Sequence, residues 1–239
     1  MTTDLAALQL TLDPARTPPT WRTWNRFMRV QRVLLGRQGI FSARGDVLGY
    51  ELFFRSPHGA PLHVDDWTAS QQDRATAHVI HATFAGPGVS SVAHDRQVFV
   101  NFTRSYLVGD LQVPCHPEQL VVEIVESVVA DNAVLAGVRR LRERGFRIAI
   151  DDFVGLASQR RLLPYADYVK IDVRDLDVEG QPLLDLARSH GAQLVAECVE
   201  TEVMLDECQT AGFELFQGNA LEVTTVLDRT DIVPSQRGG

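Results

Sequence analysis

Eight short runs of apolar and β-branched residues alternate with stretches of helical patterning between about residue 36 and residue 217. Runs of this kind are typical of strands buried on both faces, and the helical stretches between them are typical of crossover connections. The pattern predicts a parallel α/β sheet, and eight strands favour a closed barrel over an open sheet. The expected strands are GIFSA (39–43), VLGYELFF (47–54), QVFVNF (97–102), QLVVEIV (119–125), FRIAID (146–151), YVKID (168–172), AQLVAE (192–197) and FELFQ (213–217).

The link between the first two runs is the tripeptide RGD, which is too short for a crossover helix. We therefore expect the first two strands to form an antiparallel hairpin, unlike the strands of a standard (β/α)8 barrel. The predicted fold class is an α/β modified TIM barrel with this antiparallel first pair. Helices are expected over residues 65–85, 131–145, 159–166, 182–191 and 201–212.

The first 36 residues have a different character. A turn-rich spacer, DPARTPPT, precedes WRTWNRFMRVQRVLLGR (21–37), which has an apolar face, five arginines and no acid. This segment predicts a basic amphipathic helix that packs on the acidic barrel or contacts a membrane surface or a protein partner. We expect an N-terminal extension over 1–36, a barrel domain over 37–228 and a C-terminal tail over 229–239.

The chain carries a formal net charge of −8, which argues against binding of a DNA or RNA duplex by the body of the protein. Its three cysteines are far apart and lack C-x-x-C spacing, so neither a disulfide framework nor a zinc knuckle is indicated. No apolar run reaches the roughly 20 residues that span a bilayer, and the N-terminus lacks a signal-peptide pattern. We expect no transmembrane segment and a cytoplasmic location.

A polar residue stands at or near the end of almost every expected strand. In a barrel these carboxyl ends converge on one mouth, where active sites are built. A single acid after a strand often caps the next helix, but independent caps would mix Ser and Thr with the acids. The residues are Glu51, Asn101, Glu123, Asp151, Lys170, Glu197 and Gln217. Their shared position favours a functional site over independent caps.

Five carboxylates and one amide are expected at this mouth, from Glu51, Glu123, Asp151, Asp152, Glu197 and Asn101. So many acids would repel one another and have raised pKa values unless cations neutralised them. Oxygen ligands without His or Cys favour Mg²⁺ or Mn²⁺, and a pair of such ions is a common device for attacking a phosphodiester. Neighbouring strand residues face opposite ways, so Asp151 and Asp152 can share the site only if the chain turns there.

Three further charged residues accompany this set. Glu126 and Glu200 lie three positions after Glu123 and Glu197, so in an extended chain they face the other way. We interpret them as groups that support the ligands or hold loops, with plain surface acids as the alternative. Lys170 lies among apolar residues, and an unpaired buried ammonium is costly, so it should pair with a carboxylate or with a hydroxide ion at the metals.

Seven ordered blocks of the sequence resemble the EAL domain family, the phosphodiesterase module that opens the bacterial second messenger cyclic di-GMP to linear pGpG. The blocks are GYELFFR, VNF, VVEIVES, IAIDDF, VKID, AECVET and FQG. The resemblance implies a barrel with an antiparallel first strand pair and a site for two divalent ions, Mg or Mn. It is strongest to the EAL domains that are fused to an HDOD domain, and no HDOD domain is expected here.

Matched by position, the resemblance also implies individual roles. Lys170 and Glu197 look like the residues that handle the proton of the attacking water. Gln38 and Arg55 look like contacts to the cyclic dinucleotide, and Gln217 looks like a group that contacts substrate or the water around the metals. The implied metal ligands are Glu51, Asn101, Glu123, Asp151, Asp152 and Glu197.

The sequence also departs from the family. Gly39 replaces a proline, the motif reads Glu-Leu-Phe, NALEVTT follows FQG, and the loop VGLASQRR after Asp152 is shorter than the Gly-rich, Ser-containing family loop that orders the metal site and mediates dimer contacts. Two main hypotheses remain open: an active, metal-dependent cyclic di-GMP phosphodiesterase, or a weak or inactive barrel that senses cyclic di-GMP or docks a partner. Another phosphoester substrate is a third alternative, and a homodimer is a further expectation.

Overall fold

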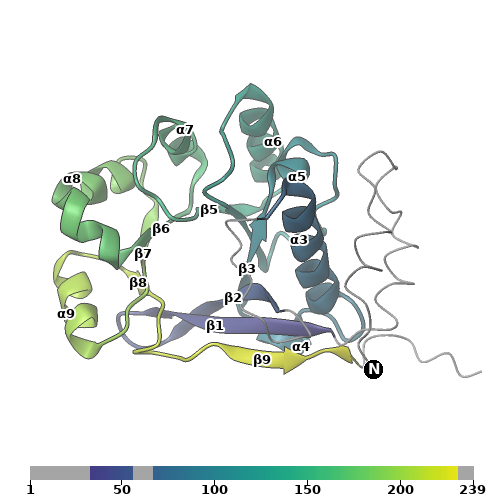
Figure 1. Ribbon diagram of the computed structural model, residues 1–239, viewed down its shortest axis with the longest axis horizontal. Coiled ribbons are helices and arrows are strands. Elements are labelled where there is room, and N and C mark those ends of the chain that lie inside the picture. The colour runs from purple at the N-terminus through teal and green to yellow at the C-terminus, as the bar shows by residue number, and fades with distance from the viewer. Residues whose placement is uncertain (1–32, 56–66, 231–239) are drawn as a thin grey trace, which may run out of the picture.

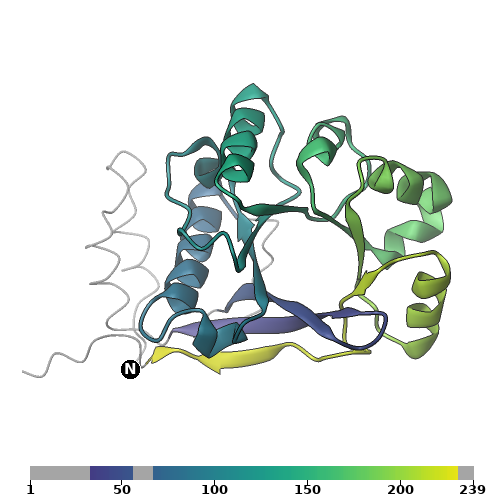
Figure 2. The same ribbon diagram turned by 180° about the vertical axis from the view of Figure 1, so that it is seen from behind.

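The computed structural model of the chain describes residues 33–55 and 67–230. Eight strands close into a ring in sequence order, and Figures 1 and 2 show this ring from opposite sides with the helices around its outside. The predicted α/β barrel is confirmed. The strands of the ring are β1 (Leu34–Ser42), β2 (Val47–Arg55), β3 (Gln97–Phe102), β4 (Leu120–Ile124), β5 (Arg147–Ile150), β6 (Tyr168–Asp172), β7 (Gln193–Glu197) and β8 (Leu215–Phe216).

The first strand runs against the other strands of the ring. β1 is antiparallel to β2 and to β8, whereas the pairs from β2–β3 to β7–β8 are parallel. The predicted antiparallel hairpin is confirmed, and Gly45 in its turn has a φ of 82°, which glycine adopts without steric cost. Because β1 is reversed, its N-terminal half lies beside the carboxyl ends of the other strands.

A ninth strand, β9 (Thr225–Asp228), was not predicted from the sequence. It pairs with Leu34–Arg37 of β1, whereas the two-residue β8 pairs only with Phe41 and Ser42. Backbone groups of Leu34–Arg37 would lack partners on that side without β9, because β8 does not reach them. Tertiary pairing, more than the apolar pattern of TVLD, therefore makes this segment a strand.

The helix expected over 21–37 is wrong at its C-terminal end. Residues 34–37 belong to β1, where Leu35 is fully buried and the backbone pairs with β2 on one side and β9 on the other. Such pairing overrides the weak helical preference of LLGR. Residues 21–32 of the expected helix lie outside the described residues, and the domain boundaries 1–36, 37–228 and 229–239 stay predictions.

The helices cover the outside of the ring. They are α3 (Ala69–Phe84), α4 (Ser90–Ala93), α5 (Arg104–Val108), α6 (Asn132–Glu143), α7 (Ala157–Arg160), α8 (Leu176–Arg188) and α9 (Glu202–Thr210), with 3₁₀ turns η2 (Leu163–Tyr165) and η3 (Val173–Asp175). Helices were predicted at the positions of α3, α6 and α9, whereas the short α4 and α5 were missed. None of the helices in the described ranges is long and apolar enough to cross a membrane.

Two expected helices have different bounds. The helix predicted over 159–166 is replaced by α7 and η2, because Pro164 lacks the N–H that a continuous helix needs. The helix predicted over 182–191 begins earlier, as α8. A kink interrupts α8 at Gly180, whose φ is 60°, two residues before Pro182.

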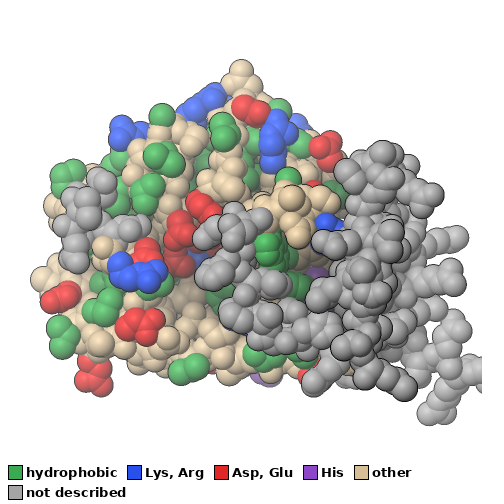
Figure 3. All heavy atoms as spheres, viewed as in Figure 1, with side chains coloured by type: hydrophobic (Ala, Val, Ile, Leu, Met, Phe, Trp, Pro, Cys, Tyr) green, Lys and Arg blue, Asp and Glu red, His purple; other side chains and the backbone are tan. Residues whose placement is uncertain are grey.

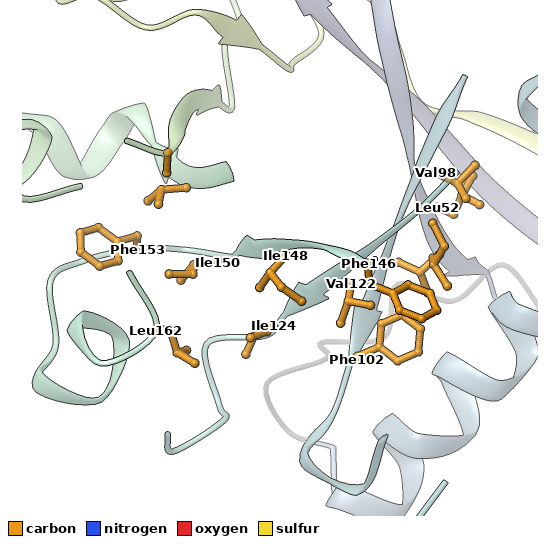
Figure 4. Packing of buried hydrophobic residues seen from close by; sticks show 14 of the residues in the cluster. Leu52, Val98, Phe102, Val122, Ile124, Phe146, Ile148, Ile150, Phe153 and Leu162 are labelled. Atoms are coloured by element: carbon orange, nitrogen blue, oxygen red, sulfur yellow. The ribbon is translucent and has the colours of Figure 1, made fainter. Parts of the chain in front are cut away.

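Two clusters of buried apolar side chains lie on the two sides of the barrel wall. The larger lies between strands and helices, and Figure 4 shows part of it, with Ile150 between Phe153 and Ile148. The smaller consists of Ile40, Phe99, Val121, Ala149, Tyr168, Val195 and Leu215, with Leu48 packed against it. This interior cluster takes one side chain from each of the eight strands, as expected for the filled interior of a small barrel.

Candidate metal centre

A layer of polar side chains lies next to the apolar interior of the barrel, on the side of the carboxyl ends of the parallel strands. On six strands a polar residue follows the interior apolar residue by two positions, and side chains two positions apart point to the same face. The pairs are Phe99 and Asn101, Val121 and Glu123, Ala149 and Asp151, Tyr168 and Lys170, Val195 and Glu197, and Leu215 and Gln217. On the reversed β1, Gln38 precedes Ile40 by two positions. The alternation that fills the interior therefore also builds the polar layer.

Glu51 brings the carboxylate of β2 into this layer. It lies opposite Gln38 in the β1–β2 hairpin and is buried. Its Oε2 accepts a hydrogen bond from Gln217 Nε2 at 2.7 Å and another from Lys170 Nζ at 2.9 Å. The side chain of Glu51 therefore connects β2 with β6 and β8 across the mouth.

Lys170 lies at the centre of the polar layer and is 1% exposed. Its Nζ lies 2.9 Å from Glu51 Oε2, 2.8 Å from Glu197 Oε1 and 3.1 Å from Asp151 Oδ1, and it also donates to Glu123 Oε1. The prediction that this ammonium pairs with carboxylates is confirmed. Lys170 is also the only lysine in the chain, and a compact ammonium suits four separate acceptors better than the planar fork of an arginine.

Burial and charge shift the pKa values of this cluster. Burial lowers the pKa of Lys170, but Asp151, Glu123, Glu197 and Glu51 outweigh it, so the pKa lies well above the usual lysine value. Burial and the charge of Glu51 raise the pKa of Glu123, and burial raises the pKa of Glu197 although Lys170 opposes it. One ammonium therefore leaves an excess of negative charge, which a bound cation would relieve.

Four oxygens of the layer are buried and have no hydrogen-bond partner among the described residues. They are Asn101 Oδ1, Glu123 Oε2, Glu197 Oε2 and Gln217 Oε1. Buried acceptors without partners are uncommon in folded proteins, so four in one layer indicate a group that they bind. Carboxylate and amide oxygens are the ligands that Mg²⁺ and Mn²⁺ prefer. The residues present therefore fit a centre for divalent metal ions.

Asp151 and Asp152 stand where β5 ends and the chain turns. β5 ends at Ile150, and Asp152 has a φ of 41°, so the alternation of the strand stops there as predicted. One oxygen from each of Asp151, Asp152 and Glu126 lies within 4.8 Å of the other two. In an extended chain Glu126 would face away from Glu123, but β4 ends at Ile124, so Glu126 can turn toward the two aspartates. Partial burial and the charge of Asp151 raise the pKa of Asp152 to about 7.

Asp172 belongs to the same region and was missed in the sequence. It ends β6 two positions after Lys170, and its charge contributes to the raised pKa of Asp152. Partial burial raises the pKa of Asp172, but hydrogen bonds from Arg174 outweigh it and lower the pKa. The signal was present in VKID, where Lys170 and Asp172 share one face of a strand.

The residues expected to bind substrate lie at two places. Gln217 Nε2 lies 3.3 Å from Gln38 Oε1, and Gln38 Nε2 donates to the backbone oxygen of Glu222 at 2.9 Å. Arg55 lies four positions after Glu51 on β2, where its guanidinium donates to the backbone oxygen of Phe54. The structure thus joins Gln38 and Gln217 to the polar layer and places Arg55 beyond it on the same strand.

Glu200 is exposed and connects two loops of the mouth. Its carboxylate oxygens accept hydrogen bonds from Asn219 Nδ2 at 3.0 and 3.2 Å, which ties the loop after β7 to the loop after β8. Between them the chain approaches so closely that a Cβ at Gly218 would overlap the backbone of Val199. This contact supports the interpretation of Glu200 as a loop-holding group, which stays a prediction.

Acidic side chains gather near the middle of the face seen in Figure 3, over the region where β5 and β6 lie in Figure 1. Glu126 and Asp152 are exposed, whereas Glu51 and Glu123 are buried. The carboxylates therefore extend from a buried floor to a solvent-exposed rim, so a cation or an anionic ligand with its cations can reach them from solvent.

The sequence matches the family model of the EAL domain over residues 22–222. The chain belongs to the EAL family. The matched range includes all eight strands of the ring and every residue of the polar layer. The order of the polar-layer residues along the strands of this EAL domain agrees with the ordered blocks that carry the family resemblance.

Two curated relatives cover most of this EAL domain. The Vibrio cholerae protein named cyclic di-GMP phosphodiesterase CdgJ is 32% identical over 209 residues, which covers 84% of this chain and 46% of that protein. The Bacillus subtilis protein YuxH is 29% identical over 207 residues, covering 84% of this chain and 49% of that protein. The chain thus spans about half the length of these relatives.

Solved structures of EAL proteins share the fold. The Bacillus subtilis protein YkuI, solved with cyclic di-GMP and calcium, gives a TM-score of 0.64 at 22% identity, covering 81% of this chain and 56% of that one. The phosphodiesterase PaMucR, solved with cyclic di-GMP, gives a TM-score of 0.62 at 21% identity, covering 81% of this chain and 92% of that one. The similarity confirms the EAL barrel fold.

Proposed function

We propose that this EAL domain hydrolyses cyclic di-GMP to linear pGpG with two divalent metal ions, Mg²⁺ or Mn²⁺. The observation that carries the proposal is the polar layer, in which four buried oxygens around the Lys170 ammonium have no partner within the described part of the chain. The curated relative CdgJ is named a cyclic di-GMP phosphodiesterase, and YkuI and PaMucR were solved with cyclic di-GMP. These names support the choice of substrate.

The metals would be held by Glu51, Asn101, Glu123, Asp151, Asp152 and Glu197. When bound, such ions activate water and stabilise negative charge on a phosphodiester. The contribution of the chain is a fixed arrangement of oxygens: Asn101 and Glu123 are direct partners on β3 and β4, and Lys170 restrains four of the carboxylates. Side chains held by the sheet in this way keep the ligands in place without a metal.

Lys170 and Glu197 have complementary properties for proton handling. The raised pKa of Lys170 keeps the ammonium charged, so it can donate a hydrogen bond to negative charge that develops during the reaction. Glu197 uses Oε1 to accept from Lys170, whereas its Oε2 has no partner among the described residues. We assign the Glu197 carboxylate as the acceptor of the proton from the attacking water, because a carboxyl group with a raised pKa suits a general base.

Gln38, Arg55 and Gln217 would contact the cyclic dinucleotide. Gln217 bonds to Gln38 and Glu51, so the two amide side chains adjoin the carboxylates. Arg55 lies further along β2, and a guanidinium can donate two parallel hydrogen bonds to a phosphate. Substrate phosphate would thus lie between the layer and Arg55.

The test is to incubate purified protein with cyclic di-GMP and Mn²⁺ or Mg²⁺ and to follow pGpG by chromatography. We expect product from the wild type and none from Glu51→Ala or Lys170→Ala, with circular dichroism showing that both remain folded. Glu118→Ala is the matched control, because Glu118 is an exposed acid just before β4, at the opposite end of the barrel. Activity that survives in both site variants would contradict the proposed site.

The second candidate is a barrel that binds cyclic di-GMP or docks a partner protein without turnover. Val154 and Leu156 favour it, because both are exposed apolar residues in the altered loop after Asp152. Binding of cyclic di-GMP by the wild type without any pGpG would select this candidate over the enzyme. A homodimer, a partner for the N-terminal helix and a cytoplasmic location stay predictions from the sequence.

A further inference from the structure

Gln159 on α7 holds together the loop that follows the two aspartates. Its Nε2 donates to the backbone oxygen of Asp152 at 2.8 Å, and its Oε1 accepts from the backbone N–H groups of Val154 and Leu156, both at 3.1 Å. The residue is 3% exposed, so these bonds are shielded from water. One side chain therefore connects three backbone groups in the segment whose sequence departs from the family.

The bond to Asp152 supports a backbone conformation that is costly by itself. Asp152 has a φ of 41°, and non-glycine residues keep such values only where their surroundings fix them. The next residue, Phe153, donates its backbone N–H to the backbone oxygen of Lys170 on β6 at 2.9 Å, and its ring is fully buried. Asp152 is therefore held between Gln159 and β6.

The direction of the Asp152 carboxylate follows from this backbone conformation. In an extended chain, Asp152 would face away from Asp151, because neighbouring residues of a strand alternate. The turn instead brings an oxygen of each of Asp151, Asp152 and Glu126 to within 4.8 Å of the other two. Gln159 thus stabilises the conformation in which this cluster of acids exists.

We propose that Gln159 is a positioning residue for the metal centre, which it serves by fixing the backbone of Asp152. The inference rests on the proposed function in one respect, namely that the carboxylates bind divalent ions. The altered loop keeps Asp152 in place through one buried glutamine side chain, that of Gln159.

The test measures the binding of Mn²⁺ alone to the full chain by isothermal titration calorimetry. Gln159→Ala removes all three bonds, whereas Gln159→Glu keeps an acceptor for Val154 and Leu156 and loses the donor to Asp152. Gln119→Ala is the matched control, because Gln119 Nε2 also donates to two backbone oxygens, those of His94 and Arg96, just before β4 and far from the mouth.

We expect both Gln159 variants to bind Mn²⁺ on the order of 10-fold more weakly, which is typical when a group that orients a metal ligand is lost. The control should bind like the wild type. The negative charge of Gln159→Glu would by itself strengthen cation binding, so weaker binding in that variant assigns the effect to the lost donor.

Wild-type affinity in both Gln159 variants would overturn the proposal, even if Gln159→Ala lowers the melting temperature, because the role would then be structural only. A wild type that binds no Mn²⁺ would also overturn it. The pGpG assay on the same preparations separates the two ideas. Weaker Mn²⁺ binding by the variants, with no pGpG from the wild type, would support Gln159 and contradict the phosphodiesterase.

Discussion

The ammonium nitrogen of Lys170 on β6 lies 2.9 Å from Glu51 Oε2 on β2, although 119 positions separate the two residues in the chain. β2 and β6 are four strands apart in a ring of eight, so this ion pair spans the barrel. Such a contact forms only when the ring is closed. The polar layer is therefore a product of the complete barrel, and Lys170 is the cation that joins its carboxylates.

Replacing Lys170 with methionine should destabilise the metal-free protein by about 3–5 kcal/mol at pH 8, because the buried carboxylates lose their cation. Adding Mn²⁺ should stabilise Lys170→Met more than the wild type, since the ions no longer compete with an ammonium. Urea unfolding with EDTA and with Mn²⁺ measures both effects. Arg96→Met is a control, because Arg96 is half-exposed and far from the mouth. Equal stability of Lys170→Met and wild type in EDTA would contradict the expected role of the ammonium.

Asp152 should make the stability of the metal-free protein depend on pH. Its pKa of about 7 in the folded state exceeds the ordinary value of 3.8, so the folded state binds this proton more tightly than the unfolded state. The free energy of unfolding should therefore fall as pH rises from about 4 to about 7. Asp152→Asn should show a smaller fall between pH 5 and pH 8 in urea unfolding with EDTA. Identical slopes for the two proteins would count against the raised pKa.

Glu222 should affect substrate binding through Gln38. Its Oε2 accepts from the backbone N–H of Gly39 at 2.7 Å, and its backbone oxygen accepts from Gln38 Nε2. A Cβ at position 39 would overlap the Glu222 carboxylate, and a proline there would also lack the N–H that donates to it. The contact with Glu222 therefore requires glycine at position 39. Glu222→Ala should raise KM for cyclic di-GMP severalfold with little change in kcat, whereas Glu222→Gln, which keeps an acceptor, should remain close to wild type. A fall in kcat at unchanged KM would contradict this account.

The sequence predicted the parts of the molecule that follow from local alternation. The bounds of β3 and β6 agree with the expected runs 97–102 and 168–172, and the polar layer lies where strand alternation placed it. The turn at Asp152 was also predictable, because two adjacent acids could share one site only if the strand ended.

The features that were missed depend on contacts between distant segments. β9 forms because β8 is too short to pair with all of β1. The start of α5 is fixed by a contact with α3, since the hydroxyl groups of Thr103 and Ser105 both donate to the carboxylate of Asp73. The sequence predicted that Lys170 pairs with a carboxylate, but its contact with four of them at once depends on the closed ring. Gln159 was the first residue of the helix expected over 159–166, and its bonds to the preceding loop left no periodic signal in the sequence.

The central claim is that Lys170 and divalent metal ions share one layer of carboxylates. Because Lys170 is the only lysine, labelling lysine with ¹³C at the ε carbon gives a single side-chain NMR resonance that reports on the layer. Titration with Mg²⁺ should move this resonance to a new, saturating position in the wild type and in Glu118→Ala, but not in Glu51→Ala. A resonance that stays in place throughout a titration to millimolar Mg²⁺ would contradict the claim.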